Sequence, residues 1–452
     1  MEIDLQQFIE LFKSILFDRY LALLNRQHFI VDKSKIRVLL SDYACEPGKG
    51  SEPGVGWNVA RELSSRVSLW VITRANNRTS IEGSGEDWIQ QVQWIYWDPP
   101  KWLTFWKKGG RGVQLFYGIW QYGVKAVAAR ALATYDFDII HHLTFGKYWI
   151  PSRLAGLPRP FVFGPVGGGE CAPPGLAVGS SLKGRISEIA KGLVIGLVAK
   201  LPGTKSLYRS AAWSFAATAQ TELALRRLGV SRVSVLPQSG IRPSDLPQID
   251  IEHPSRRRES GELVLVTAAR LIHWKAIDLA IEAVAMASQT IQVRLIVLQT
   301  GPEMENLRAL AKRLGVQELV EFKGRLPSLQ DVYQEIARSD ALVHPALHEA
   351  FGQACLESLA LGVPVICLNW GGPGLIVDSN TGFAVEPGNR AETVSRLAHA
   401  IVDLAAERKN RLSRASACKA RAFGEFHWEK LADEIVDKYH EVATTPAAGQ
   451  KR

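Results

Sequence analysis

The sequence predicts an α/β fold in which two doubly wound domains face each other across a cleft. In each half of the chain, short β-branched and apolar runs alternate with helical stretches, which is typical of parallel sheets. A Pro- and Ser-rich segment, residues 235–247, separates the two series, and 452 residues exceed one ordinary domain. Because such sheets bind ligands outside the carboxyl ends of their strands, functional residues are expected in the cleft.

Each series consists of runs that are short enough to be buried strands. In the first half the expected strands are Ile36–Asp42, Val67–Thr73, Val92–Trp97, Asp138–Leu143 and Phe161–Phe163, with a helix over Tyr117–Leu132. In the second half they are Leu263–Thr267, Val293–Leu298, Leu319–Phe322, Ala341–His344 and Val363–Leu368. We therefore expect one domain over residues 35–238 and a second over residues 239–425.

A separate N-terminal extension, residues 1–34, precedes the first strand. Apolar side chains recur at steps of three and four over residues 5–24, which predicts an amphipathic helix. Its charges at Glu10, Lys13 and Asp18 exclude a membrane-spanning segment. The helix either docks on its own domain, which is the favoured interpretation, or lies in a membrane interface.

The composition is that of a globular protein with an anionic partner. Hydrophobic residues make up 46% and charged residues 22% of the chain, and the formal net charge is +9. Five cysteines without a CxxC pair argue against a disulfide framework or a zinc site. Acidic residues follow Met1 directly and no cleavage site follows, so we expect no signal peptide and a cytoplasmic location.

The segment "HEAFGQACLESLALGVPVI", residues 348–366, raises the first question about function. Between Phe351 and Val363 the only charged side chain is Glu357, and no basic residue lies three or four positions away. A partner must therefore come from elsewhere. A helix that starts with Gly352 can hold an anion at its free N–H groups, which places Glu357 roughly 7 to 8 Å along the helix, within reach of ribose hydroxyls.

This segment resembles the retaining glycosyltransferases of family 4, also called glycosyltransferase group 1, which have the GT-B fold. The resemblance covers roughly residues 35–440. It implies that Glu349 contacts the sugar of a nucleotide-sugar donor and that Glu357 contacts the nucleotide ribose. It also implies that the donor is held by the backbone of Phe351, Gly352 and Gln353.

The resemblance continues at "LVTAARLIHWKAIDLAIEAVA", where Arg270 and Lys275 match the basic pair that holds the donor diphosphate. Preorganised cations stabilise a leaving diphosphate as its charge develops, so no metal and no cofactor are expected. Ala269 and Ala276 replace glycines that are usual at these positions in the family.

Two further motifs match weakly. Gly301 begins a GPE turn, and a loop with paired glycines spans residues 371–387. The last helix of the family returns to the first domain, which would apply here to residues 426–452, with a disordered tail after Thr444.

In the first half, Gly54 and Gly56 follow the first strand in "ACEPGKGSEPGVGWNVARELSS" and would let the backbone approach a ligand. A dinucleotide fingerprint is excluded because Val59 stands where a third glycine is needed. The alternative is a plain strand-to-helix turn. A third glycine-rich loop, residues 164–174, carries Glu170 as a candidate acceptor contact.

"DFDIIHHLTFG" resembles the family's strand that ends in histidine near the donor sugar. His141 and His142 are adjacent and therefore point to opposite faces of the strand. Both are candidate catalytic residues, and the sequence leaves open which of them faces the cleft. Asp136 and Asp138 spell a DxD motif, but at a strand entry, so we do not assign a metal site to them.

Residues 99–112, "PPKWLTFWKKGGRG", interleave aromatic and basic side chains without an acid, and residues 182–205 form a second basic and apolar stretch. Such segments favour an anionic membrane surface, with a solvated surface as the alternative. No nucleic-acid motif accompanies them, so nucleic acid is not an expected partner.

The resemblance, together with these observations, implies a metal-independent, retaining glycosyltransferase. Its partners would be a nucleotide-sugar donor and a saccharide or lipid-linked acceptor, and it would contact the inner face of the cytoplasmic membrane peripherally. Two alternatives remain at this point: a nucleotide-sugar epimerase of GT-B fold, and a non-catalytic protein that binds a sugar or a lipid carrier.

Overall fold

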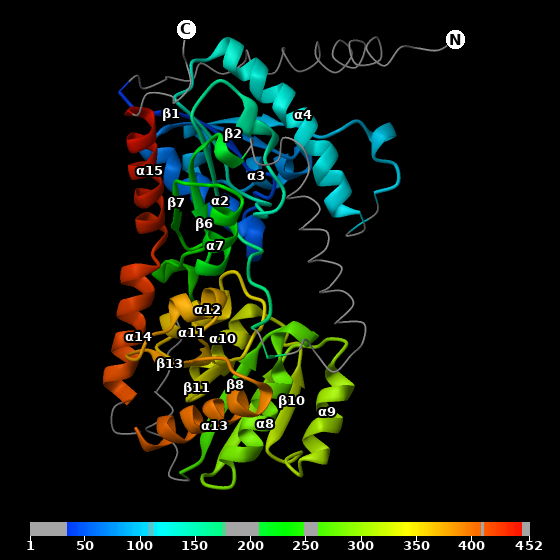
Figure 1. Ribbon diagram of the computed structural model, residues 1–452, viewed down its shortest axis with the longest axis vertical. Coiled ribbons are helices and arrows are strands. Elements are labelled where there is room, and N and C mark those ends of the chain that lie inside the picture. The colour runs from blue at the N-terminus through cyan, green and yellow to red at the C-terminus, as the bar shows by residue number, and fades with distance from the viewer. Residues whose placement is uncertain are drawn as a thin grey trace.

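Two sheets, each built from parallel strands, form the cores of two lobes that lie one above the other (Figure 1). The computed structural model describes residues 34–107, 109, 112–173, 175–176, 208–247, 261–407 and 411–444. The expected N-terminal helix, the basic stretch at residues 182–205 and the tail after Thr444 lie outside the described residues.

The N-terminal sheet has seven strands in the order β3-β2-β1-β4-β5-β6-β7. Their bounds are β1 Arg37–Ser41, β2 Ser68–Thr73, β3 Val92–Tyr96, β4 Ile139–His142, β5 Phe161–Val166, β6 Ala211–Ala216 and β7 Val233–Val235. All six neighbouring pairs run parallel. The order reverses direction between β1 and β4, which makes this pair the topological switch point where doubly wound sheets bind ligands.

The C-terminal sheet repeats this topology with six strands in the order β10-β9-β8-β11-β12-β13. Their bounds are β8 Leu263–Ala268, β9 Val293–Leu298, β10 Val320–Gly324, β11 Ala341–His344, β12 Val365–Leu368 and β13 Gly382–Val385. The neighbouring strands are again parallel. The predicted fold class is therefore confirmed, and the switch point of this sheet lies between β8 and β11.

Helices cover both faces of each sheet, which explains why the strands are apolar on both sides. In β1, Leu39 packs into one core cluster while Val38 and Leu40 pack into another on the opposite face. The N-terminal lobe contains α2 Ser51–Arg66, α3 Arg78–Glu82, α4 Val113–Thr134, α7 Ala219–Arg227 and α15 Trp428–Thr444. The C-terminal lobe contains α8 Ile277–Ala287, α9 Met304–Arg313, α10 Leu329–Ala337, α11 Gln353–Ala360, α12 Gly371–Ile376, α13 Arg390–Ala406 and α14 Arg411–Glu425.

Three strands were not predicted. β6 and β7 complete the N-terminal sheet, and β13 lies at the edge of the C-terminal sheet. The β6 sequence "AAWSFA" is rich in small residues, and β7 is only three residues long. β6 carries no strong β-branched pattern, and β7 is too short to show one, so pairing with the adjacent strands defines them.

The chain passes between the lobes twice, and the two passages touch each other. After β7 the backbone enters the C-terminal lobe, and after α14 it returns so that α15 packs against α2 and β6 (Figure 1). The amide of Ile241 in the outgoing segment donates a 2.9 Å hydrogen bond to the carbonyl of Phe426 in the returning segment. A Cβ on Gly240 would lie 2.8 Å from that same carbonyl, so the close approach requires glycine.

A buried ion pair anchors this junction. Arg242, in the outgoing segment, places its guanidinium 2.5 Å from a carboxylate oxygen of Glu62 on α2, and both side chains are about one-tenth exposed. The same guanidinium donates to Asn58 at 2.6 Å and lies over the Trp428 ring of α15. The junction is therefore fixed by three elements that are remote in sequence.

Candidate active site at the carboxyl edge of the C-terminal sheet

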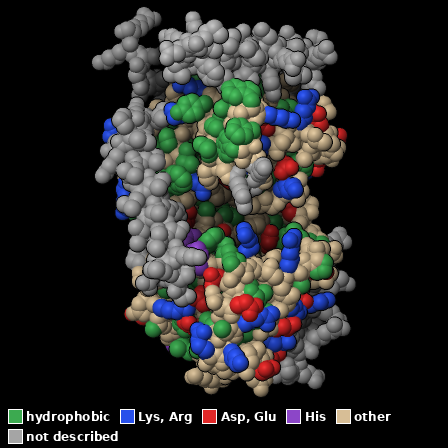
Figure 2. Space-filling view, turned by 90° about the vertical axis from the view of Figure 1, so that its right-hand side faces the viewer, with side chains coloured by type: hydrophobic (Ala, Val, Ile, Leu, Met, Phe, Trp, Pro, Cys, Tyr) green, Lys and Arg blue, Asp and Glu red, His purple; other side chains and the backbone are tan. Residues whose placement is uncertain are grey.

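The candidate residues of the second half converge at the switch point between β8 and β11. Arg270 and Lys275 follow the end of β8, and Glu349 follows the end of β11. The amide of Leu347 donates to the carbonyl of Trp274 at 2.9 Å, which ties the two loops together. Figure 2 shows a hollow between the two lobes, with basic, acidic and histidine side chains around it.

Glu349 is the centre of a three-residue cluster. The ammonium of Lys275 pairs with its Oε2, and Nε2 of His344 lies 3.3 Å from the same oxygen. Burial by itself raises the pKa of Glu349, but the hydrogen bond from His344 and the charge of Lys275 outweigh it and lower that pKa to about 2. The carboxylate is therefore ionised throughout the physiological pH range.

His344 was not predicted as a site residue. It is the last residue of β11, is 3% exposed, and burial lowers its pKa, so the ring is neutral. Because its partner is a carboxylate, we assign the ring proton to Nε2. Its position at the carboxyl end of a central strand is the signal that could have identified it.

Arg270 differs from Lys275 in its surroundings. Its side chain is exposed, and the described part of the chain offers it no ion-pair partner. A cation with this freedom is available to an anionic ligand at the mouth of the site.

The glycine motifs of the second half brace these loops. A Cβ on Gly301 would lie 2.2 Å from the Leu271 carbonyl, so the predicted donor-binding turn packs beneath the segment that carries Arg270 and Lys275. A Cβ on Gly372 would lie 2.1 Å from the carbonyl of Phe351, and its amide donates to the carbonyl of Glu349 at 2.9 Å. In this structure both motifs hold the backbone around the cluster.

Helix α11 begins where the sequence predicted. Gly352 is its N-cap with a φ of +92°, a conformation that glycine adopts without strain, and Gln353 is the first helical residue. The side chain of Ser239, from the segment between the lobes, donates to Oε1 of Gln353 at 2.8 Å. The amino end of α11 therefore lies against the interdomain junction.

Glu357 has partners within the protein. Tyr333 on α10 and Gln353, one turn earlier on α11, hydrogen-bond its carboxyl group. Burial nevertheless raises the pKa of Glu357 from an ordinary 4.5 to about 7. Glu357 was expected to have a partner from outside its helix, and Tyr333 is one. A tyrosine hydroxyl, however, cannot neutralise the charge of the carboxylate.

Replacing Glu357 with glutamine should change how stability depends on pH. Between about pH 4.5 and 7 the native state holds a proton that the unfolded state has lost, so the free energy of unfolding falls as the pH rises through this window. Glu357→Gln removes this dependence. The free energy of unfolding of the variant, relative to that of the wild type, should therefore increase by on the order of 2 kcal/mol from pH 5 to pH 8. Urea titrations at both pH values measure the difference. Glu335→Gln on α10 is the control, and a wild-type-to-variant difference that does not change with pH would contradict the assignment.

On the other side of the hollow, Gly54 and Gly56 lie in the first turns of α2. A Cβ on Gly56 would meet the Ala44 carbonyl at 2.2 Å and the Asp42 carboxylate at 2.3 Å, so the helix packs directly on the end of β1. Asp42 is fully buried, and burial raises its pKa to about 7. The contacts of Gly56 show a packing role, and a role of Gly54 and Gly56 in donor binding stays a prediction.

His141 and His142 correct an expectation. They do point to opposite faces of β4, but both are buried, at 0% and 2% exposed, so neither faces the cleft. The ring of His141 contacts Tyr439 of α15 at 2.5 Å and the Gly164 carbonyl at 2.6 Å. The ring of His142 contacts Tyr117 at 2.9 Å and a serine hydroxyl at 2.7 Å. With both nitrogens of each ring engaged inside the lobe, these histidines join helices to the sheet.

The glycine-rich loop after β5 contacts residues of both lobes. Its Glu170 side chain accepts hydrogen bonds from Thr218 at 2.5 Å and Thr221 at 2.6 Å, so the predicted acceptor contact is held inside its own lobe. The ring of His348 approaches the Glu170 carbonyl at 2.5 Å, and the Trp370 indole donates to the Cys171 carbonyl at 2.8 Å. The loop therefore lies next to the segment that carries Glu349.

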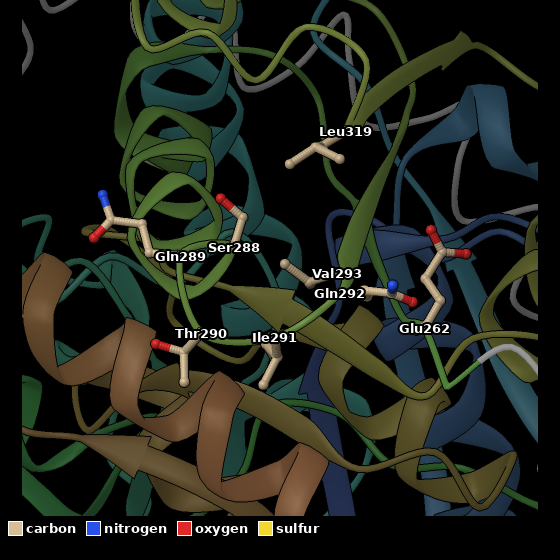
Figure 3. A pocket seen from close by; sticks show the side chains of 8 residues that line it. All are labelled: Glu262, Ser288, Gln289, Thr290, Ile291, Gln292, Val293 and Leu319. Atoms are coloured by element: carbon tan, nitrogen blue, oxygen red, sulfur yellow. The ribbon is translucent and has the colours of Figure 1, made fainter.

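Two other features lie away from this site. Asp136 and Asp138 of the DxD motif pair with Arg37 at 3.0 Å at the entry of the N-terminal sheet. A hollow of about 600 Å³ is lined by Glu262, Leu319 and residues 288–293 (Figure 3). It is at the amino ends of β8 and β9, opposite the edge where Lys275 and Glu349 meet, and Glu262 is the one charged group among its described lining residues.

Comparison with known proteins points to the same region. Residues 248–417, which contain the whole cluster around Glu349, match the family model described as Glycosyl transferases group 1. The chain is 26% identical over 206 residues to a GDP-mannose-dependent alpha-(1-6)-phosphatidylinositol dimannoside mannosyltransferase of Mycobacterium tuberculosis, covering 44% of this chain and 51% of that protein. It is 30% identical over 214 residues to a D-inositol 3-phosphate glycosyltransferase of Rhodococcus erythropolis, covering 45% and 46%. The chain thus spans about half the length of the curated relatives that it matches.

Solved structures resemble the chain over a greater length. The Anabaena protein HepE in complex with UDP has a TM-score of 0.58 at 19% identity, covering 90% of this chain and 100% of that one. Sucrose-phosphate synthase of Thermosynechococcus elongatus has a TM-score of 0.61 at 17% identity, covering 90% and 99%. At these identities the likeness establishes the shared two-domain fold.

Proposed function

We propose that the protein is a glycosyltransferase that moves a sugar from a nucleoside diphosphate donor to an acceptor hydroxyl. The meeting of Arg270, Lys275 and an ionised Glu349 at the switch point of a parallel sheet supports this most directly. The family match over the same residues supports it as well. The names of two matched proteins, a GDP-mannose-dependent enzyme and a UDP complex, suggest the class of donor.

In this proposal each group has one task. Arg270 and Lys275 bind the diphosphate and stabilise its charge as the bond to the anomeric carbon breaks. The amino end of α11 at Gly352 adds backbone N–H groups. Glu349 accepts hydrogen bonds from sugar hydroxyls, and Glu357 does so from the ribose.

Retention of configuration, without a metal, is the finer part of the proposal. The acceptor oxygen bonds to the anomeric carbon on the face that the diphosphate leaves, and the acceptor proton passes to the departing phosphate oxygen. This route needs no protein nucleophile, and the two basic side chains provide the charge stabilisation that a metal would otherwise supply.

Thermal unfolding with nucleotides tests the donor class. UDP, GDP, ADP, CMP and their sugar conjugates are added to the wild type and to Glu357→Ala. Specific binding to the native state raises its stability by about 2.7 kcal/mol at 100 times the dissociation constant. We expect a rise with one nucleotide family that is reduced in the variant. No rise with any of them, or conversion of the sugar nucleotide to an epimer without an acceptor, would overturn the proposal.

For the acceptor we propose a lipid-linked saccharide reached at an anionic membrane. Large apolar side chains are exposed on the N-terminal lobe around α4, where Figure 2 shows hydrophobic side chains gathered on one face. They are Trp102 at 56%, Phe105 at 79%, Leu115 at 62% and Tyr122 at 61%. Lys101 and Lys107 flank them and suit acidic headgroups. Among the described residues, no helix has the length and apolar character that crossing a bilayer requires.

Replacing Phe105 with glutamate should weaken membrane binding. We expect co-flotation of the wild type with vesicles of phosphatidylcholine and phosphatidylglycerol, and a loss of about tenfold in Phe105→Glu, because a charge replaces an inserted ring. Leu412→Glu, at a leucine on α14 that is 66% exposed against 79% for Phe105, is the control. Equal flotation of all three proteins, or equal flotation on neutral vesicles, would contradict this assignment.

A further inference from the structure

Two donors share one oxygen of Glu349. Lys275 and His344 both contact Oε2, the former through its ammonium and the latter through Nε2 at 3.3 Å. Within the described residues, Oε1 of Glu349 accepts no hydrogen bond. The carboxylate is thus held on one side and open on the other.

The single ammonium of Lys275 cannot pair fully with the Glu349 carboxylate and with a diphosphate at the same time. Its ammonium is a single compact charge on a flexible stem, so it can turn toward a stronger anion nearby. A diphosphate carries more negative charge than one carboxylate. Arg270, which is exposed, would bind the ligand without giving up a partner, whereas Lys275 must leave Glu349 to do so.

His344 is suited to remain. Its short side chain is fixed at the end of β11 and is 3% exposed, and a neutral ring is not drawn toward a phosphate. Its Nδ1 is buried with no hydrogen-bond partner among the described residues, so Nε2 makes the only side-chain hydrogen bond of the ring there. His344 has no competing contact to which it could move.

We propose that donor binding transfers Lys275 from Glu349 to the diphosphate, and that His344 is the positioning residue that then keeps the Glu349 carboxylate aimed at the sugar. This inference rests on the proposed function and concerns the same site. Under this proposal the Lys275–Glu349 ion pair of the free protein competes with the donor for Lys275. Oε1 of Glu349 is then available to accept a hydrogen bond from a sugar hydroxyl.

The exchange is tested by calorimetric titration with UDP, GDP and ADP. Glu349→Gln removes the competitor, so the nucleotide that binds the wild type should bind this variant about 5- to 10-fold more tightly. Glu282→Gln breaks an ion pair of 2.7 Å with Arg390 elsewhere in the same lobe and should leave the dissociation constant unchanged. Unchanged or weaker binding by Glu349→Gln would overturn the exchange.

A second background separates the exchange from simple repulsion between Glu349 and phosphate. In Lys275→Met there is no cation to release, so adding Glu349→Gln should alter the dissociation constant by less than about twofold. If the tightening persists in that background, direct repulsion is its cause and the exchange is wrong.

The role of His344 is tested by its conservative variant. His344→Leu should lower kcat for transfer by about 10- to 100-fold while the KM for the donor and the dissociation constant of the nucleotide stay within twofold. His344→Gln, which can still donate a hydrogen bond, should recover most of kcat. His399→Leu, at an exposed histidine of α13, is the control. Equal losses in both His344 variants, or a parallel loss of nucleotide binding, would overturn the positioning role.

These outcomes are distinct from a failure of the proposed function. If the wild type binds none of UDP, GDP and ADP, the proposed donor class and the inference both fail. If it binds a nucleotide and transfers its sugar but the variants behave otherwise than described, only the inference fails.

Discussion

Replacing Lys275 with methionine is expected to reduce kcat/KM for sugar transfer by about 100- to 1,000-fold. Removal of one preorganised charge from a partly enclosed site commonly costs this much, since the developing charge on the leaving group loses its nearest partner. Methionine keeps most of the volume of the side chain, and Lys275 is only 17% exposed, so the local packing is retained. Release of nucleoside diphosphate from the donor in the presence of acceptor measures the rate.

Lys312→Met is the matched control for this prediction. Lys312 lies in the last turn of α9, is exposed, and stands outside the candidate site. Its replacement should leave kcat/KM within about twofold, as is usual for surface substitutions. A Lys275→Met enzyme with more than one-third of wild-type activity would show that another group carries the charge of the diphosphate.

Replacing Arg242 with methionine should have the largest effect on stability. The change removes the more buried of the two cations that pair with Glu62, since Arg66 stays at 3.1 Å, and the loss of a buried pair should cost up to about 3 to 5 kcal/mol. The loss should appear as a lower urea midpoint. It should be accompanied by faster proteolysis near residues 236–246, because this side chain joins the outgoing segment to α2 and α15.

Two further variants test the cause of that loss. Adding Glu62→Leu to Arg242→Met removes the carboxylate that has lost its most buried partner. Because Arg66 keeps Asp433 as a partner at 2.7 Å, the double variant should recover more than half of the lost stability. Arg226→Met breaks an exposed pair of 2.7 Å with Glu222 and should cost less than about 1 kcal/mol. If Arg226→Met and Arg242→Met have the same effect, burial of the pair is not the source of its contribution.

Most strands of the two sheets could be predicted because they are buried on both faces and therefore appear as short, continuous apolar runs. The runs that became β1, β2, β8 and β9 consist of β-branched and large apolar residues, and each lies within two residues of its expected bounds. β6 escaped prediction because alanine and serine in "AAWSFA" carry little preference for strand. Its place is decided by pairing with β5 and β7, which no local pattern encodes.

The candidate site was predictable where a charge is out of place in an apolar segment. Glu349 and Glu357 stood out for that reason, and the basic pair followed from its position after a strand. His344 was overlooked because a histidine at the end of an apolar strand also suits a structural role. His141 and His142 are also histidines in an apolar strand, but their contacts are structural. Tyr439 and Tyr117, on helices that are distant in sequence, contact their ring nitrogens.

The contact between the two passages of the chain makes the C-terminal lobe an insertion within the N-terminal one. Ile241 and Phe426 are joined by a hydrogen bond of 2.9 Å although 185 positions separate them in the sequence. The segment between them can therefore be excised and its ends closed by a short turn, without stretching the backbone of the remaining lobe. The shortened gene would encode β1 to β7 with α15 in place, which provides a direct way to ask whether the N-terminal lobe folds without the C-terminal one.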